Sequence, residues 1–221
     1  LVGSEMCIRD RSSKVLAVRG SIKPATVDHI KLSADLKNGD HVIGESNIRS
    51  MGSTVSKIYI DPSEAKAYKP SVEAILEADT VILGPGSLYT SVLPNLLVHG
   101  ICEALKDTEA TIIYVCNVAT EIGETGGYDL SNHVEALQKH TFPNIVDYVI
   151  ANDNLTDIGD RFAGEAVQNI PSTSGHIEYI YNDLVDIDNP VRHDSLKLSQ
   201  VIIGVSNKGK KPKARVDRGI N

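Results

Sequence analysis

The sequence predicts an α/β protein with a Rossmann-like parallel sheet, flanking helices and, before them, a small β-rich subregion. Two observations support this prediction. Residues 13–62 contain short apolar runs bounded by turn residues, and residues 63–205 alternate between strand patterns and helical patterns. Strands that are separated by helices favour a parallel sheet with right-handed crossover connections.

The β-rich part is expected to consist of short strands and one hairpin. Apolar runs lie at residues 15–18, 30–36, 41–43 and 55–60, and the second and third flank Asn38-Gly39. Asn-Gly is the strongest short-range sequence signal for a two-stranded hairpin. This part contains no recognisable group of catalytic residues. We expect surface or loop positions for four of its charged or titratable residues, namely Arg19, Asp28, His29 and Glu45.

The second part opens with a short amphipathic helix, in which Pro70 stands near the start and Val72, Ile75 and Leu76 share one face. The further predicted elements are, in order, a strand at 80–83, a helix at about 94–105, a strand at 111–116, a helix at 131–140, a strand at 145–151, a helix at 157–167, an extended segment at 177–184 and a final helix capped by Asp194. The inward faces of these helices are assigned to Leu97, Ile101, Leu105, Val134, Leu137, Leu198, Val201 and Ile202.

Composition and charge exclude several classes of protein. The 221 residues suffice for one large domain or two small ones, and a formal charge of −7 argues against general nucleic-acid binding, which favours a basic patch. No apolar stretch approaches the roughly 18 residues that a membrane span requires. The three cysteines show neither metal-ligand spacing nor a disulfide framework, which fits a reducing cytoplasm.

The two ends are set apart from the domain predicted at residues 13–205. Residues 1–12 have no clear period and no signal-peptide pattern, so they are interpreted as a non-native leader, and the native amino terminus is expected to be missing. Residues 206–221 are rich in glycine and lysine and are expected to form a solvated, disordered basic tail. A weak contact of this tail with an acidic partner is the alternative.

The most informative segment follows the predicted strand at 80–83 and combines two glycines with four hydroxyl residues. In an open α/β sheet, ligands bind at the carboxyl ends of strands, and the free N–H groups of a helix start suit a phosphate. The segment is not the dinucleotide fingerprint G-x-G-x-x-G, because Tyr89 replaces the last glycine. The alternative is a tight turn in which the hydroxyls cap the helix and bind no ligand. The candidate ligand-binding residues of the turn are Gly84, Gly86, Ser87, Tyr89, Thr90 and Ser91.

A second polar loop, residues 117–128, follows the predicted strand at 111–116. If the two strands are neighbours in the sheet, both loops lie at one edge and form a shared cleft. Glu121 and Glu124 would then hold a ribose or sugar hydroxyl, although the solvated state is the more common one for a Glu considered alone. The candidate ligand-binding residues of this loop are Asn117, Thr120, Glu124, Thr125 and Tyr128.

A third candidate group precedes the final helix. Arg192 is able to bind a phosphate through two hydrogen bonds, and His193 is able to orient a ligand or exchange a proton. In the alternative, which the spacing favours, Asp194 caps the helix while Arg192 and His193 face water. No H-E-x-x-H or C-x-x-C pattern occurs, so the sequence assigns neither catalytic residues nor metal ligands.

Five strings of the sequence carry a family resemblance: LGPGSLYTSVLPNLLV at 83–98, YVCN at 114–117, GETGGY at 123–128, SNHVEAL at 131–137 and RHD at 192–194. They resemble the bacterial gluconeogenesis factor family, which is itself similar to the 2-phospho-L-lactate transferases of the CofD-like superfamily. The resemblance extends over about residues 13–204. Two departures are His99, where proline is expected, and Glu121-Ile122, where a Gln-Pro-like pair is expected. The glycine-rich GGGTG-type loop and the acidic segment of such proteins do not occur here and are expected upstream.

The resemblance implies a cytoplasmic protein that binds a nucleotide or nucleotide-sugar, with a UDP-sugar as the expected ligand. It further implies a role in cell shape and cell-wall morphogenesis under gluconeogenic growth. The implied partners are cell-wall regulatory proteins and further copies of the chain in a homo-oligomer. Neither a nucleic-acid partner nor a membrane span is expected. Mg²⁺ is expected only together with the upstream segment.

Three functions compete on this basis. The leading one is a regulatory binding protein. The alternative is a 2-phospho-L-lactate transferase-type enzyme, which moves a phospholactyl group from a nucleotide donor to a deazaflavin-like acceptor. An assembly scaffold is the third. Two Phe and no Trp offer few aromatic walls for a flat deazaflavin, which favours the binding protein.

Overall fold

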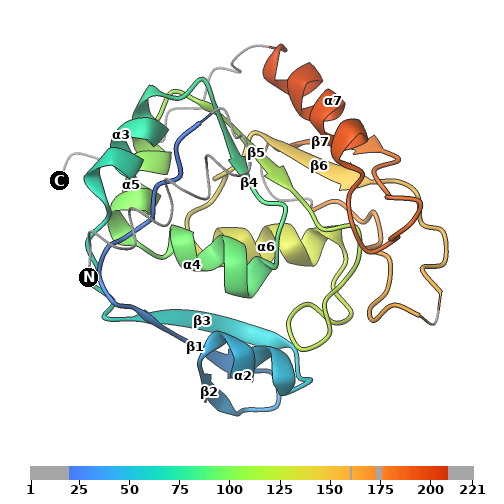
Figure 1. Ribbon diagram of the computed structural model, residues 1–221, viewed down its shortest axis with the longest axis horizontal. Helices are drawn as coiled ribbons and strands as arrows, with labels where there is room; N and C mark the ends of the chain where they lie inside the picture. The colour runs from blue at the N-terminus through green and yellow to red at the C-terminus, as the bar shows by residue number, and fades with distance from the viewer. Residues whose placement is uncertain (1–19, 160, 173–175, 209–221) are drawn as a thin grey trace.

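The computed structural model describes residues 20–159, 161–172 and 176–208, and these residues form two sheets with helices between and around them (Figure 1). The larger sheet is parallel, with the strand order β4 (Thr80–Leu83), β5 (Thr111–Val115), β6 (Tyr148–Asn152) and β7 (Glu178–Asn182). The smaller sheet is antiparallel, with the strand order β2 (His41–Ile43), β1 (Lys31–Leu36) and β3 (Val55–Asp61). The predicted fold class is therefore confirmed. The leader, the run at 15–18 and most of the tail lie outside the described residues.

The small sheet forms where the sequence predicts a hairpin. β1 pairs with β2, and Gly39 in the connecting turn has a φ of +94°, a conformation that glycine adopts readily. β3 pairs with the other side of β1. A short helix that the sequence analysis did not predict, α2 (Glu45–Ser50), connects β2 to β3 and buries Ile48 completely.

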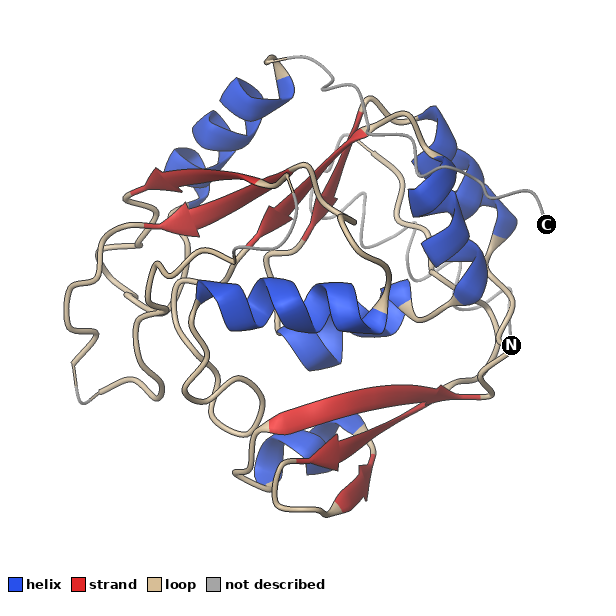
Figure 2. Ribbon diagram, turned by 180° about the vertical axis from the view of Figure 1, so that it is seen from behind, coloured by secondary structure: helices blue, strands red, loops and turns tan. Residues whose placement is uncertain are grey.

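Helices cover both faces of the parallel sheet (Figures 1 and 2). On one face lies α7 (Ser195–Ser206), and between the other face and the small sheet lie α6 (Leu130–His140) and α4 (Leu93–Leu96). At one end of the molecule, α3 (Lys69–Glu77) and α5 (His99–Asp107) pack side by side. None of the helices in the described ranges combines the length and the apolar character that a membrane crossing needs.

The parallel sheet is buried on both faces at its centre. Every residue of β5 and of β6 is buried, as expected for strands with helices on either side. Ile112 and Tyr114 of β5 belong to the apolar cluster that continues into the small sheet, whereas Ile113 and Val115 pack with Leu198 of α7. Successive residues of one strand thus hold two layers of the molecule together.

The helix predicted at 94–105 is divided in the structure. A wide helical turn, η1 (Leu88–Val92), leads into α4, and Val98 then adopts extended backbone angles (φ −68°, ψ 110°) before α5 begins. Val98 is fully buried, and a Cβ on Gly100 would lie 2.6 Å from the Cβ of Ala67. Close packing against the segment before α3 therefore overrides the continuous helical pattern.

The helix predicted at 157–167 is wrong, because the described residues of this segment are irregular. Gly159 (φ +74°) and Gly164 (φ +105°) have left-handed backbone conformations that interrupt a helix. The segment instead lies against the loop after β5, where the Thr120 N–H donates to the Glu165 carbonyl at 2.8 Å. Its backbone groups find partners across the loop rather than within a helix.

Candidate functional site

The turn after β4 and the loop after β5 lie side by side at the carboxyl edge of the parallel sheet. β4 and β5 are neighbours in parallel register, which confirms the shared edge that the sequence analysis expected. The two segments are joined directly, because the Gly86 N–H donates to Asn117 Oδ1 at 3.3 Å. Gly84 has a φ of +88°, and a Cβ there would lie 3.0 Å from the Val115 carbonyl oxygen, so the turn requires glycine at this position.

The four hydroxyl residues of the turn occupy different environments. Tyr89 and Thr90 are buried, Ser87 is half-buried and Ser91 is exposed. The Ser87 carbonyl accepts from the N–H groups of Ser91 and Val92, which begins the helical turn η1. The predicted set is therefore not one continuous ligand surface.

Two carboxylates of the second loop accept hydrogen bonds from the turn. Glu121 accepts from Ser87 Oγ at 2.5 Å and from Asn117 Nδ2 at 2.8 Å. Glu124 accepts from Thr90 Oγ1 at 2.7 Å. Glu124 is fully buried and does not adopt the solvated state that is usual for Glu, and burial is the main cause that raises the pKa of its carboxyl.

A guanidinium that the sequence analysis missed completes this group. Arg49, on α2, donates to Thr90 Oγ1 at 2.9 Å, to Ser87 Oγ at 3.2 Å and to Glu124 Oε1 at 3.1 Å, while 46% of its side chain stays exposed. Nothing local marks Arg49, because its helix was not predicted and Ser87 lies 38 residues away along the chain. We refer to the group as the edge cluster, which consists of Arg49, Ser87, Thr90, Asn117, Glu121 and Glu124.

The two threonines predicted in the second loop have partners inside the protein. Thr120 Oγ1 accepts from the Glu165 N–H at 3.0 Å, and Thr125 Oγ1 accepts from the Glu121 N–H at 2.9 Å. Both threonines are buried. They hold the loop in shape and so position Glu121 and Glu124, rather than facing an open cleft.

The two tyrosines of the candidate set meet beneath the turn. The hydroxyls of Tyr89 and Tyr128 lie 2.8 Å apart, and Tyr128 also donates to the Val55 carbonyl at 3.2 Å. The ring of Tyr89 meets the His140 ring edge-on at 5.7 Å, and that of Tyr128 meets His133 at 5.5 Å. Burial raises the pKa of both tyrosine hydroxyls. This aromatic group connects the turn to α6 and to the small sheet.

The structure separates the members of the third predicted group. His193 Nε2 lies 3.1 Å from the carbonyl oxygen of Cys116 at the end of β5, and burial lowers the pKa of its imidazole. Arg192 is exposed. Asp194 accepts from two N–H groups in the first turn of α7, which confirms the predicted cap, whereas the expectation that His193 faces water is wrong.

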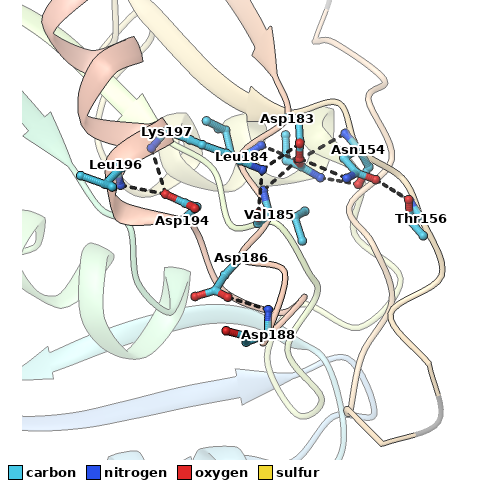
Figure 3. A network of polar contacts seen from close by, with 11 residues as sticks. Asn154, Thr156, Asp183, Leu184, Val185, Asp186, Asp188, Asp194, Leu196 and Lys197 are labelled. Carbon is cyan, nitrogen blue, oxygen red and sulfur yellow. Dashed lines mark hydrogen bonds and ion pairs between the residues drawn. The ribbon is translucent and has the colours of Figure 1, made fainter.

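A cavity of about 310 Å³ lies beyond the edge cluster, at the carboxyl ends of β6 and β7. Figure 3 shows the polar network beside it, in which Asn154 Nδ2 donates to Asp183 at 3.1 Å and Lys197 Nζ donates to Asp183 at 2.8 Å. Asn152 and Val118 also line the cavity. None of these residues was assigned a role from the sequence, although Val118 and Asn152 stand just after predicted strands, a usual position for ligand contacts.

Reactive thiols and metal clusters are not features of this part of the molecule. Within the described ranges, no three His, Cys, Asp or Glu side chains gather as a metal centre requires. Burial raises the pKa of the free Cys116 thiol to about 12, so it has little thiolate character at neutral pH.

Comparison with known proteins establishes the family. The family model described as "2-phospho-L-lactate transferase CofD" matches residues 4–176. The chain belongs to the CofD family. Two departures from the expected family pattern, His99 and Glu121-Ile122, leave this membership intact.

This CofD family member is similar to proteins named gluconeogenesis factor. It is 41% identical over 207 residues to the putative gluconeogenesis factor of Thermoanaerobacterium thermosulfurigenes, covering 88% of this chain and 64% of the relative. It is 37% identical over 199 residues to the gluconeogenesis factor of Halalkalibacterium halodurans, covering 86% of this chain and 62% of the relative. A crystal structure of a UPF0052 family member from Bacillus halodurans superposes with a TM-score of 0.77 at 37% identity, covering 88% of this chain and 65% of that one. The chain therefore spans less than two thirds of the length of each.

Proposed function

We propose that this CofD family member is a cytoplasmic regulatory protein of the gluconeogenesis factor type that binds a nucleotide-sugar, with a UDP-sugar as its ligand. The observation that carries the proposal is the edge cluster, in which a half-exposed guanidinium and the Ser87 hydroxyl meet a glycine turn. Arginine binds phosphate oxygens strongly, and the carboxyl edge of a parallel sheet is the usual ligand position in such folds.

The diphosphate would bind at the turn. Gly84 and Gly86 allow the backbone to approach the ligand, and Arg49 would exchange its bond to Ser87 for phosphate oxygens. Glu121, which accepts from Ser87 in this structure, would then accept a ribose or sugar hydroxyl. The ligand thus replaces hydrogen bonds that already exist.

The cavity at the ends of β6 and β7 would receive the uncharged part of the ligand. The side-chain amides of Asn152 and Asn154 are hydrogen-bonded to neighbouring protein groups in this structure, and they would exchange some of these bonds for a uracil ring or a sugar. Asp157, Asp183 and Asp186 outnumber the one lysine, Lys197, in the described lining of the cavity, and the excess of negative charge favours hydroxyl and amide groups over phosphate. The two regions therefore suit the two ends of a nucleotide-sugar.

The relatives named gluconeogenesis factor support a proposed cellular role during gluconeogenesis. The protein would report nucleotide-sugar supply to the regulators of cell shape and cell-wall morphogenesis when carbon flows through gluconeogenesis. Cell-wall regulatory proteins and a second copy of the chain are its proposed partners.

The description of the family model favours a second candidate function, a 2-phospho-L-lactate transferase. In that case the chain would transfer a phospholactyl group from a nucleotide donor to a deazaflavin-like acceptor. Incubation with both substrates and chromatography of the products distinguishes the two functions, because a binding protein forms no phospholactyl deazaflavin.

Calorimetric titration of the intact protein with UDP-glucose tests the binding proposal. We expect saturable binding that falls at least about tenfold in Gly86→Val, because the branched side chain blocks the approach of the diphosphate. A Cβ at this position lies 3.4 Å from the Cβ of Ser91, and the φ of +159° is one that residues other than glycine rarely adopt, so circular dichroism must show a retained fold before lost binding is assigned to the blocked approach.

Gly204→Val is the matched control, since it adds the same side chain where a Cβ meets nothing within 4 Å. It should bind UDP-glucose like the unmodified protein. Equal affinity in Gly86→Val and Gly204→Val would contradict the role of the turn.

A further inference from the structure

A second cavity, of about 340 Å³, lies between β3, the carboxyl end of α6 and the junction of α4 and α5. None of the residues that line it belongs to the edge cluster or to the cavity at the ends of β6 and β7. Its size falls within the range of small-molecule sites in proteins. The proposed nucleotide-sugar function does not use it.

The charge of this second cavity is opposite to that of the chain. Asp and Glu outnumber Lys and Arg by 29 to 22 in the sequence, yet the described lining contains Lys57, Lys139 and His140 and no carboxylate. Burial lowers the pKa of His140, the hydrogen bond to the Ala136 carbonyl raises it, and the positive charges of Lys139 and Lys57 lower it, so both lysines lie within electrostatic reach of His140.

The lysines of the cavity are not consumed by ion pairs. Within the part of the chain that the structure describes, the lysines held in ion pairs are Lys69, Lys106, Lys197 and Lys208. Asp35 is opposite Lys57 on the neighbouring strand, but its carboxylate already accepts from Tyr59 at 2.6 Å and contacts His41 at 2.7 Å. The C-terminal turn of α6 carries a partial negative charge, which the Lys139 ammonium offsets.

The free edge of β3 adds a backbone donor to this positive surface. β3 is the last strand of its sheet, and the Ile58 N–H points away from β1 and donates to His140 Nε2 at 3.2 Å. His140 Nδ1 lies 2.7 Å from the Ala136 carbonyl, so Nδ1 carries the proton and the imidazole is neutral. Because hydrogen bonding alternates along an antiparallel edge strand, the Ile60 N–H points to the same side as that of Ile58.

An apolar wall completes the second cavity. Ile58, Ile60 and Leu97 contribute to its lining beside the charged groups. An inorganic anion would leave this wall unused, whereas a molecule with a carbon skeleton and one anionic group would contact both parts.

We propose that this second cavity binds a small phosphorylated metabolite, with the phosphate between Lys57 and Lys139 and the carbon skeleton against Ile60 and Leu97. The site is separate from the proposed nucleotide-sugar site. Lysine binds phosphate as a point charge, and the Ile60 N–H supplies a directional hydrogen bond.

Nuclear magnetic resonance titration of the intact ¹⁵N-labelled protein tests this site with phenyl phosphate as the probe. We expect saturable shifts of the Ile58, Tyr59 and Ile60 amides, which phenol does not cause. Lys57→Met and Lys139→Met should each weaken binding at least about threefold, because each removes one charge and keeps the apolar stem.

Lys69→Met is the matched control, since Lys69 is an exposed lysine on α3 that pairs with Glu73 outside the cavity. It should leave the affinity for phenyl phosphate unchanged, and Gly86→Val should do the same because it affects only the nucleotide-sugar site. The proposal is overturned if the three amides show no saturable shift, if Lys69→Met weakens binding as much as Lys57→Met, or if UDP-glucose displaces the probe competitively.

Discussion

At the scale of single residues, the Glu124 carboxyl is a buried acidic group whose pKa is raised by its burial. Its side chain is fully buried. The Oε2 atom has no hydrogen-bond partner among the described residues. Its other oxygen accepts from Thr90 at 2.7 Å and from Arg49 at 3.1 Å. Because a buried charge is tolerated only with such partners, Arg49 should be needed for stability as well as for a ligand.

Arg49→Met is expected to lower the free energy of unfolding by about 1–2 kcal/mol, since it leaves the buried Glu124 without its counter-charge. The additional substitution Glu124→Gln should restore at least half of the loss, because the amide oxygen still accepts from Thr90 and carries no charge. Urea unfolding of the single and double variants measures both effects. A double variant less stable than Arg49→Met would refute the pairing.

At the scale of elements, α7 depends on its capping residue. The Asp194 side chain accepts from the N–H groups of Leu196 at 2.8 Å and Lys197 at 3.0 Å (Figure 3). Asp194→Ala should therefore lower the free energy of unfolding by about 1 kcal/mol and Tm by about 2–4 °C in thermal unfolding. Asp194→Asn keeps an acceptor and should stay within about 0.5 kcal/mol. Asp188→Ala, at an exposed loop position, is the control, and an equal effect there would disprove the cap.

At the scale of the whole molecule, buried histidines should make stability depend on pH. Burial lowers the pKa of His133, His140 and His193. Each binds fewer protons in the folded than in the unfolded protein, so the free energy of unfolding falls as the pH drops below about 6.5. The raised pKa of Glu124 acts in the opposite direction, because its contribution is lost as the pH rises above the unfolded value.

Because three histidine shifts oppose one carboxyl shift, the urea midpoint should be lower at about pH 5.5 than at about pH 7.5. His140→Gln should reduce this difference, while His99→Gln, at an exposed position, should not. If the difference between the two pH values is unchanged in His140→Gln, His140 does not contribute to the pH dependence of stability.

The sequence by itself determined the strands, the hairpin and the cap of the last helix. These features depend on short-range patterns, namely apolar runs of strand length, Asn38-Gly39 between two of them, and Asp194 just before a helical period. The alternation of strands and helices also sufficed to predict a parallel sheet, and hence the common edge of the loops after β4 and β5.

Only the tertiary structure decided which side chains meet at that edge. Arg49 contacts Ser87 and Glu124 across 38 and 75 residues of chain, and no local pattern encodes such pairs. The segment at 157–167 likewise follows its contacts with the loop after β5 rather than its helical pattern. Burial, charge pairing and cavity lining arise from elements that are distant in sequence, so they exist only once the layers have packed.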